Sequence, residues 1–137
     1  MLLHSPPIAA GWLKMLTAVR QQSQLPGALR ELIIMRVAAL NRARYEAVMH
    51  EGIALQEGLT QEQLDDVLEW RMSPRFDRRQ RAVLAYVDAM TREIQVPNDV
   101  FAEICSWFDN RAIVELTVTV SAYNMVSRFL EALEIHP

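Results

Sequence analysis

The segment from Glu31 to His50 constrains the fold of this chain more than any other stretch. Between Ala28 and Leu40 it is apolar on almost every side of a helix, which predicts a helix buried either inside the domain or in an oligomer. Charged side chains, Glu31 and Arg36 among them, interrupt this run. Burying a carboxylate without a partner costs free energy. Glu31 therefore needs either a structural partner or a chemical use.

Helical spacing of apolar residues, with clear start and stop signals, predicts an all-α fold of about six to seven helices in a single domain, residues 1–137. The alternating stretch 117–121 could be a strand by itself, but its flanks keep helical spacing and no second strand candidate could pair with it. Capping-box patterns begin at Thr60 and Asp77. The first helix opens at Ser5-Pro6-Pro7 and its unit ends at Pro26-Gly27; the others are expected at about 28–40, 43–57, 60–70, 77–94, 97–108 and 111–133.

Bulk composition argues against several classes of protein. The net charge of -3 is unlike that of non-specific nucleic-acid binders, which need a basic surface. No apolar run reaches the roughly 18 residues of a membrane span, and the N-terminal residues lack the pattern of a secretory signal. The single cysteine, Cys105, excludes an intramolecular disulfide, and its apolar neighbours predict a small buried side chain rather than a reactive thiol. We therefore expect a cytoplasmic protein that binds neither nucleic acid nor a membrane.

The residues from Leu29 to Asn41, followed by Tyr45-Glu46 and His50, resemble the core of the carboxymuconolactone decarboxylase and alkylhydroperoxidase D (AhpD-like) superfamily. The resemblance covers most of the chain, with its core motif over residues 28–58. It implies an AhpD-like helical bundle that acts on a small-molecule substrate. It also implies a homo-oligomer, a trimer or a hexamer, with the apolar helices at 28–40 and 111–133 suited to burying surface between subunits.

The peroxidase branch of this superfamily carries a glutamate, then a Cys-x-x-Cys pair, then a histidine four residues after the second cysteine. On this chain the glutamate corresponds to Glu31 and the histidine to His50, whereas the two cysteine positions hold Ala43 and Glu46. Thiol peroxidase chemistry needs one thiolate to attack the peroxide and a second thiol to resolve the product. The resemblance therefore favours the decarboxylase-like branch, which lacks the redox pair.

Three residues are the candidate catalytic groups. Glu46 and His50 lie four residues apart and share a helix face, so the carboxylate could orient the imidazole, which could then move a proton at a carbon acid. The alternative is an exposed ion pair worth about 0.3 kcal/mol. Glu31 could reach the same site as a second acid–base group, or it could form a buried ion pair with Arg36 or Arg128.

Three further residues are candidates for substrate binding. Tyr45 could line the pocket, or it could pack as an aromatic residue with its hydroxyl bonded. Asn124 and Arg128 are four residues apart on the last helix, and Arg128 suits a substrate carboxylate. The alternative for this pair is a hydrogen-bond network between helices or subunits. No residues have the spacing of metal ligands, and no cofactor is expected.

The first functional hypothesis is a cofactor-independent enzyme similar to carboxymuconolactone decarboxylase. It would act on a lactone or keto acid, with His50, Glu46 and Glu31 doing acid–base chemistry. One alternative is an alkylhydroperoxidase or peroxiredoxin-like activity, which would have to use Cys105 alone. The other is a non-catalytic ligand-binding or scaffold protein with this fold.

Overall fold

The computed structural model describes residues 1–137, and all of its regular secondary structure is helical, which confirms the all-α prediction. The stretch 117–121, which alternates like a strand, lies inside the last helix. The longer helices are α1 (Pro6–Thr17), α2 (Gly27–Asn41), α3 (Arg44–Gln56), α5 (Arg78–Asp88), α6 (Asn98–Trp107) and α7 (Asn110–Ala132). The shorter elements are η1 (Leu2–His4), the π-helical turns η2 (Ala18–Gln22) and η3 (Ala89–Glu93), and α4 (Gln61–Asp66).

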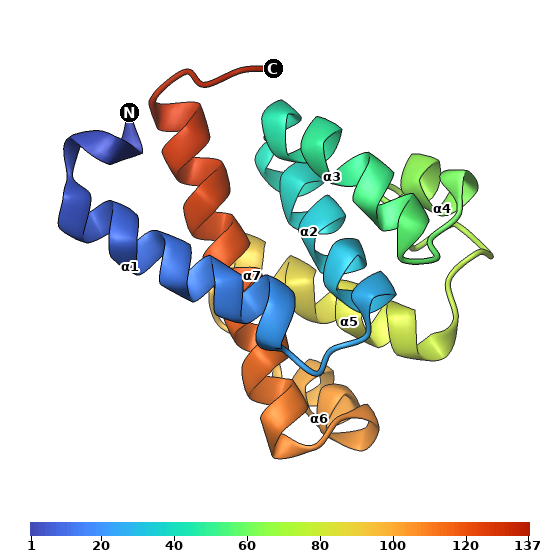
Figure 1. Cartoon of the computed structure of the whole chain (residues 1–137). Coiled ribbons are helices and arrows are strands. Elements are labelled where there is room, and N and C mark those ends of the chain that lie inside the picture. Colours follow the sequence, from blue (N-terminus) through green and yellow to red (C-terminus); the bar gives the residue numbers. More distant parts are fainter.

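Helix α2 is the centre of the fold and packs against α3, α5 and α7 (Figure 1). Its side chains Leu32, Ile33, Ile34 and Val37 are completely buried in the core. Helix α1 crosses α7 on one side of the molecule, and α6 lies at the end away from α3 (Figure 1). The apolar character of α2 is therefore explained within one chain, and α2 leaves little apolar surface for the subunit contact expected of it.

The helix boundaries follow local chemistry. The predicted capping boxes are confirmed, because the side chains of Thr60 and Asp77 accept hydrogen bonds from the backbone N–H three residues later. The break expected between the helices at 28–40 and 43–57 falls at Arg42, which adopts a left-handed conformation with φ 55°. This turn ends α2 and lets α3 pack along it, which brings Glu31 and His50 within reach of each other.

Helix α4 is shorter than expected, since it ends at Asp66 and not near Trp70. The reason is tertiary. The buried guanidinium of Arg36 donates through Nη1 to the backbone carbonyls of Val67 and Leu68, at 2.9 and 2.8 Å. Arg36 binds these carbonyl oxygens, so they are not paired within a helix. The chain after α4 therefore bends around the guanidinium in a series of turns.

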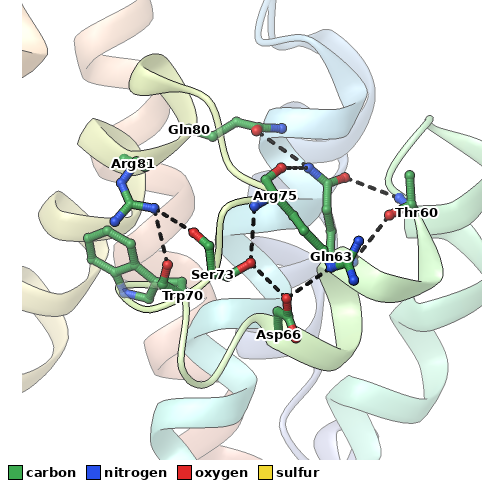
Figure 2. Close-up of polar contacts among 8 residues, drawn as sticks. All are labelled: Thr60, Gln63, Asp66, Trp70, Ser73, Arg75, Gln80 and Arg81. Carbon is green, nitrogen blue, oxygen red and sulfur yellow. Dashed lines mark hydrogen bonds and ion pairs between the residues drawn. The ribbon is translucent and has the colours of Figure 1, made fainter.

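Further side chains hold the turns between α4 and α5, as Figure 2 shows. Arg81 donates to the carbonyls of Trp70 and Ser73, at 3.3 and 2.9 Å. Gln63 donates to the carbonyl of Arg75 at 3.0 Å. The segment has no regular secondary structure, but side-chain hydrogen bonds satisfy backbone carbonyls that would otherwise be bonded within a helix.

Two other expectations need correction. The helix expected through Ile94 is α-helical only to Asp88 and continues as the π-helical turn η3, after which Ile94 has φ 67°. Cys105, expected to be buried, is exposed on α6, because only one side of this helix packs against the core. None of the helices combines the length and hydropathy that a membrane crossing requires.

Candidate active site

A buried hydrogen bond joins α2 to α3 at the residues that the sequence singles out. Glu31 Oε2 lies 2.7 Å from His50 Nδ1, and the two residues are only 1% and 6% exposed. The other carboxylate oxygen, Oε1, accepts a hydrogen bond from Arg30 Nε at 3.1 Å. Glu31 therefore fixes the imidazole ring and favours a proton on Nδ1. His50 Nε2 makes no hydrogen bond within the protein, so it is the ring nitrogen left for a ligand.

Glu46 lies one helical turn before His50 on α3 and is 5% exposed. Its Oε2 atom is enclosed and has no hydrogen-bond partner. Burial raises the pKa of this carboxyl group; the charges of His50 and Arg20 oppose the rise, and the charge of Glu31 adds to it. A carboxyl group with a raised pKa keeps its proton to higher pH, so Glu46 can donate a hydrogen bond or a proton where an ordinary glutamate could not.

Tyr123 on α7 completes the surroundings of the histidine. Its ring meets the His50 ring edge to face, with centroids 5.2 Å apart and an interplanar angle of 88°. Burial raises the pKa of its hydroxyl, so Tyr123 stays neutral and can only donate or accept a hydrogen bond. No sequence pattern singled out Tyr123, which lies on the last helix. No local spacing links it to His50, because the contact is made between α3 and α7.

The hydrogen bond to His50 comes from a different glutamate than the sequence predicts. The sequence predicts that Glu46 orients His50, but the hydrogen bond to Nδ1 comes from Glu31. The alternative of a buried ion pair from Glu31 to Arg36 or Arg128 is wrong. Arg36 bonds Asp88 instead, with Nε 2.6 Å from Oδ1, and Glu31 pairs with its neighbour Arg30. The exposed ion pair proposed as the alternative for Glu46 and His50 is also excluded, because both side chains are buried.

The three candidates for substrate binding are not gathered at His50. The side-chain oxygen of Asn124 accepts from Asn41 at 3.0 Å, and its nitrogen donates to Thr91 at 2.9 Å. For Asn124, the alternative of a network between helices is therefore correct. Arg128 is exposed and makes no hydrogen bond or ion pair, and Tyr45 is half-buried without a bonded hydroxyl. No group of three or more His, Cys, Asp or Glu side chains is positioned to hold a metal ion.

The model of the family described as "Carboxymuconolactone decarboxylase family" matches residues 6–89, which is more than half of the chain. The chain belongs to this family. The matched region runs from α1 into η3 and includes Glu31, Glu46 and His50, whereas Tyr123 lies outside it.

Similar proteins agree on the fold. YnjA, an uncharacterised protein of Escherichia coli (strain K12), is 26% identical over 126 residues, which are 91% of this chain and 66% of YnjA. This chain therefore spans just under two thirds of the length of that relative. The crystal structure of ATU0492 from Agrobacterium tumefaciens, a protein of unknown function proposed to be the antioxidant defence protein AhpD, matches with a TM-score of 0.91 and 28% identity over 98% of this chain and 93% of that one.

A third protein shares the fold at lower identity. The debrominase Bmp8, in complex with 2,3,4-tribromopyrrole, matches with a TM-score of 0.83 and 17% identity over 96% of this chain and 71% of that one. Together these structures confirm the predicted AhpD-like helical bundle.

Proposed function

We propose that this protein is a thiol-independent acid–base enzyme that transfers a proton at a carbon next to a carbonyl group, as in the decarboxylation of a lactone or keto acid. One observation carries the proposal. A buried carboxyl group with a raised pKa, that of Glu46, has an enclosed unpartnered oxygen beside an imidazole held by a second carboxylate. Groups with perturbed pKa values in such surroundings are typical of acid–base sites.

The roles follow from the contacts of each residue. Glu31 accepts from His50 Nδ1 and stabilises the positive charge that the ring carries when it is protonated. Nε2–H of the protonated ring is then the donor for a developing enolate oxygen. Glu46, whose raised pKa lets it keep its proton to higher pH, is the acid that delivers a proton to carbon.

In such a decarboxylation, the carbon–carboxylate bond breaks and carbon dioxide leaves. The electron pair of that bond moves into the neighbouring carbonyl group as an enolate, which His50 stabilises. Return of this electron pair forms a carbon–hydrogen bond with the proton of Glu46, and Glu46 then regains a proton from water. The sum is one substrate carboxylate and one proton converted to one product and one carbon dioxide, with no oxidant or reductant.

A peroxidase activity, the alternative given by the superfamily, finds no support at this site. Ala43 and Glu46 stand at the positions of the two cysteines. The remaining thiol, Cys105, is exposed on α6, at the end of the molecule away from α3 (Figure 1). A thiol there cannot use His50 as its base.

Turnover of a panel of β-keto acids and carboxylated γ-lactones in D2O tests the proposal. We expect release of carbon dioxide with deuterium at the newly protonated carbon for at least one compound. Glu46→Gln and His50→Ala should lower that rate by about 100-fold or more, the usual contribution of an acid–base group. Glu51→Gln, which removes an exposed carboxylate from the same helix, is the matched control and should keep the wild-type rate. A ligand that raises the melting temperature yet is never converted would favour the scaffold alternative and contradict the proposal.

A further inference from the structure

A largely apolar hollow of about 570 Å³ lies against the N-terminal helix. Side chains from η1 and α1, Leu13 and Leu16 among them, supply most of its lining, which extends to η2. Arg20, on η2, is the only charged residue that lines it. A hollow of this kind suits a ligand with an apolar body and a single anionic group.

The guanidinium of Arg20 is unpaired within the protein. The structure contains seven ion pairs, and Arg20 takes part in none of them, nor in any side-chain hydrogen bond. Its positive charge acts on Glu46 and Tyr123, where it opposes the rise in pKa that burial causes. Arg20 therefore lines the hollow, and its charge also influences groups around His50.

The backbone at Arg20 is also unusual. Helix α1 ends at Thr17 and continues as the π-helical turn η2, which carries Val19 into the core and leaves Arg20 exposed. π-Helical turns occur frequently at functional sites, because the wider spiral changes the direction of a side chain. The widened turn thus places Arg20 at the hollow while Val19 stays in the core.

We propose that this hollow binds the apolar part of a monocarboxylic acid while Arg20 binds its carboxylate. The proposal goes beyond the proposed function, because the residues that line the hollow include neither Glu46 nor His50. The planar guanidinium matches a carboxylate with two parallel hydrogen bonds. Arg20 thereby takes the role that the sequence suggested for Arg128.

Calorimetric titration of the whole protein with octanoate and with octanamide, its neutral counterpart, tests this inference. We expect wild-type protein to bind octanoate at least about tenfold more tightly than octanamide, since one good ion pair is worth about that factor. Arg20→Gln should reduce octanoate binding to the octanamide level, and Arg20→Lys should restore part of it. Arg92→Gln is the matched control, because Arg92 is likewise exposed on a π-helical turn but lines no hollow described here. It should bind octanoate as the wild type does.

Leu13→Glu tests the apolar part of the site. It should weaken the binding of both octanoate and octanamide without changing the mass of the protein in solution. Equal binding of octanoate by the wild type and Arg20→Gln would overturn the inference. So would a wild type that binds no octanoate while Leu13→Glu converts an oligomer to a monomer, because the hollow would then be a contact between copies. Binding is measured without turnover, so octanoate binding through Arg20 in a protein that releases no carbon dioxide would refute only the proposed function.

Discussion

At the scale of single residues, Glu46 is the costliest side chain of the candidate site. Its carboxyl group is buried, and one of its oxygens has no partner to compensate for lost water. The neighbouring Glu31 is buried too, but it bonds both Arg30 and His50. Functional sites commonly trade stability for function. Glu46 is therefore the residue at which the cost of the site should be measurable.

We predict that Glu46→Gln stabilises the protein at neutral pH. The pKa of Glu46 is raised in the folded chain, so between the unfolded and folded pKa values the folded state binds more protons. The free energy of unfolding therefore falls as pH rises through this interval and stays lower above it. The Glu46→Gln variant does not undergo this loss of stability. Its melting temperature should therefore exceed that of the wild type at pH 7 and match it at about pH 4. Glu51→Gln should show no such pH-dependent gain, and a Glu46→Gln protein that melts below the wild type at pH 7 would contradict the account.

The residues of the site were more predictable than their contacts. Glu31, Glu46 and His50 could be selected because charge in a helix buried on every side is unusual and because four-residue spacing defines a face. Spacing could not tell which glutamate bonds the histidine, because the turn at Arg42 decides that by bringing α3 against α2. Tyr123 was out of reach for the same reason, since its contact with His50 joins helices that are far apart in sequence.

At the scale of elements, α2 is fixed to its neighbours by charged groups at different points along its length. Glu31 binds α3 through His50, and Arg36 binds α5 through Asp88. Burial by itself would raise the pKa of Asp88, but hydrogen bonds from Arg36 and Arg71 outweigh burial and lower it. Local signals predicted the starts of α4 and α5 well, since both rest on capping boxes. They could not predict the end of α4, because a residue 31 positions away bonds the carbonyl of Val67.

We predict that Arg36→Met destabilises the protein by about 3–5 kcal/mol, the usual cost of removing one partner from a buried ion pair. The substitution leaves Asp88 without its closest buried donor and frees the carbonyls of Val67 and Leu68. Urea unfolding followed by circular dichroism measures the loss. Arg71→Met is the control, because Arg71 also bonds Asp88 but is about half exposed, and its loss should cost about 1 kcal/mol or less. An equal loss in the free energy of unfolding for the two variants would contradict the expectation that the buried ion pair of Arg36 contributes more to stability than the exposed one of Arg71.

At the scale of the whole molecule, exposed apolar side chains indicate surfaces for self-association. Val48 and Met49 on α3 and Val114 on α7 are each more than half exposed. The sequence predicted a trimer or hexamer with α2 and α7 at the subunit contacts. Because α2 is enclosed by its own chain, we propose α3 and α7 as the helices that would form such a contact. Apolar periodicity in α2 signals burial, but it does not say whether the same chain or another copy provides it.

We predict that the protein is a trimer or a hexamer at micromolar concentration, because burying the exposed apolar side chains of α3 and α7 is favourable. Light scattering coupled to size exclusion gives the mass. Met49→Glu should lower it, since a charge in an apolar contact has no partner, whereas Glu51→Gln on the same helix should leave it unchanged. A wild-type protein with the mass of a monomer would contradict the prediction.

We propose that this family member works by proton transfer through the Glu31–His50 pair and Glu46, without a thiol. The most direct test of this proposal is a parallel assay of carbon dioxide release and peroxide consumption by the wild type, His50→Ala and Cys105→Ser. The account predicts release of carbon dioxide that survives in Cys105→Ser and falls by about 100-fold or more in His50→Ala. Peroxide consumption lost in Cys105→Ser, or carbon dioxide release unchanged in His50→Ala, would contradict it.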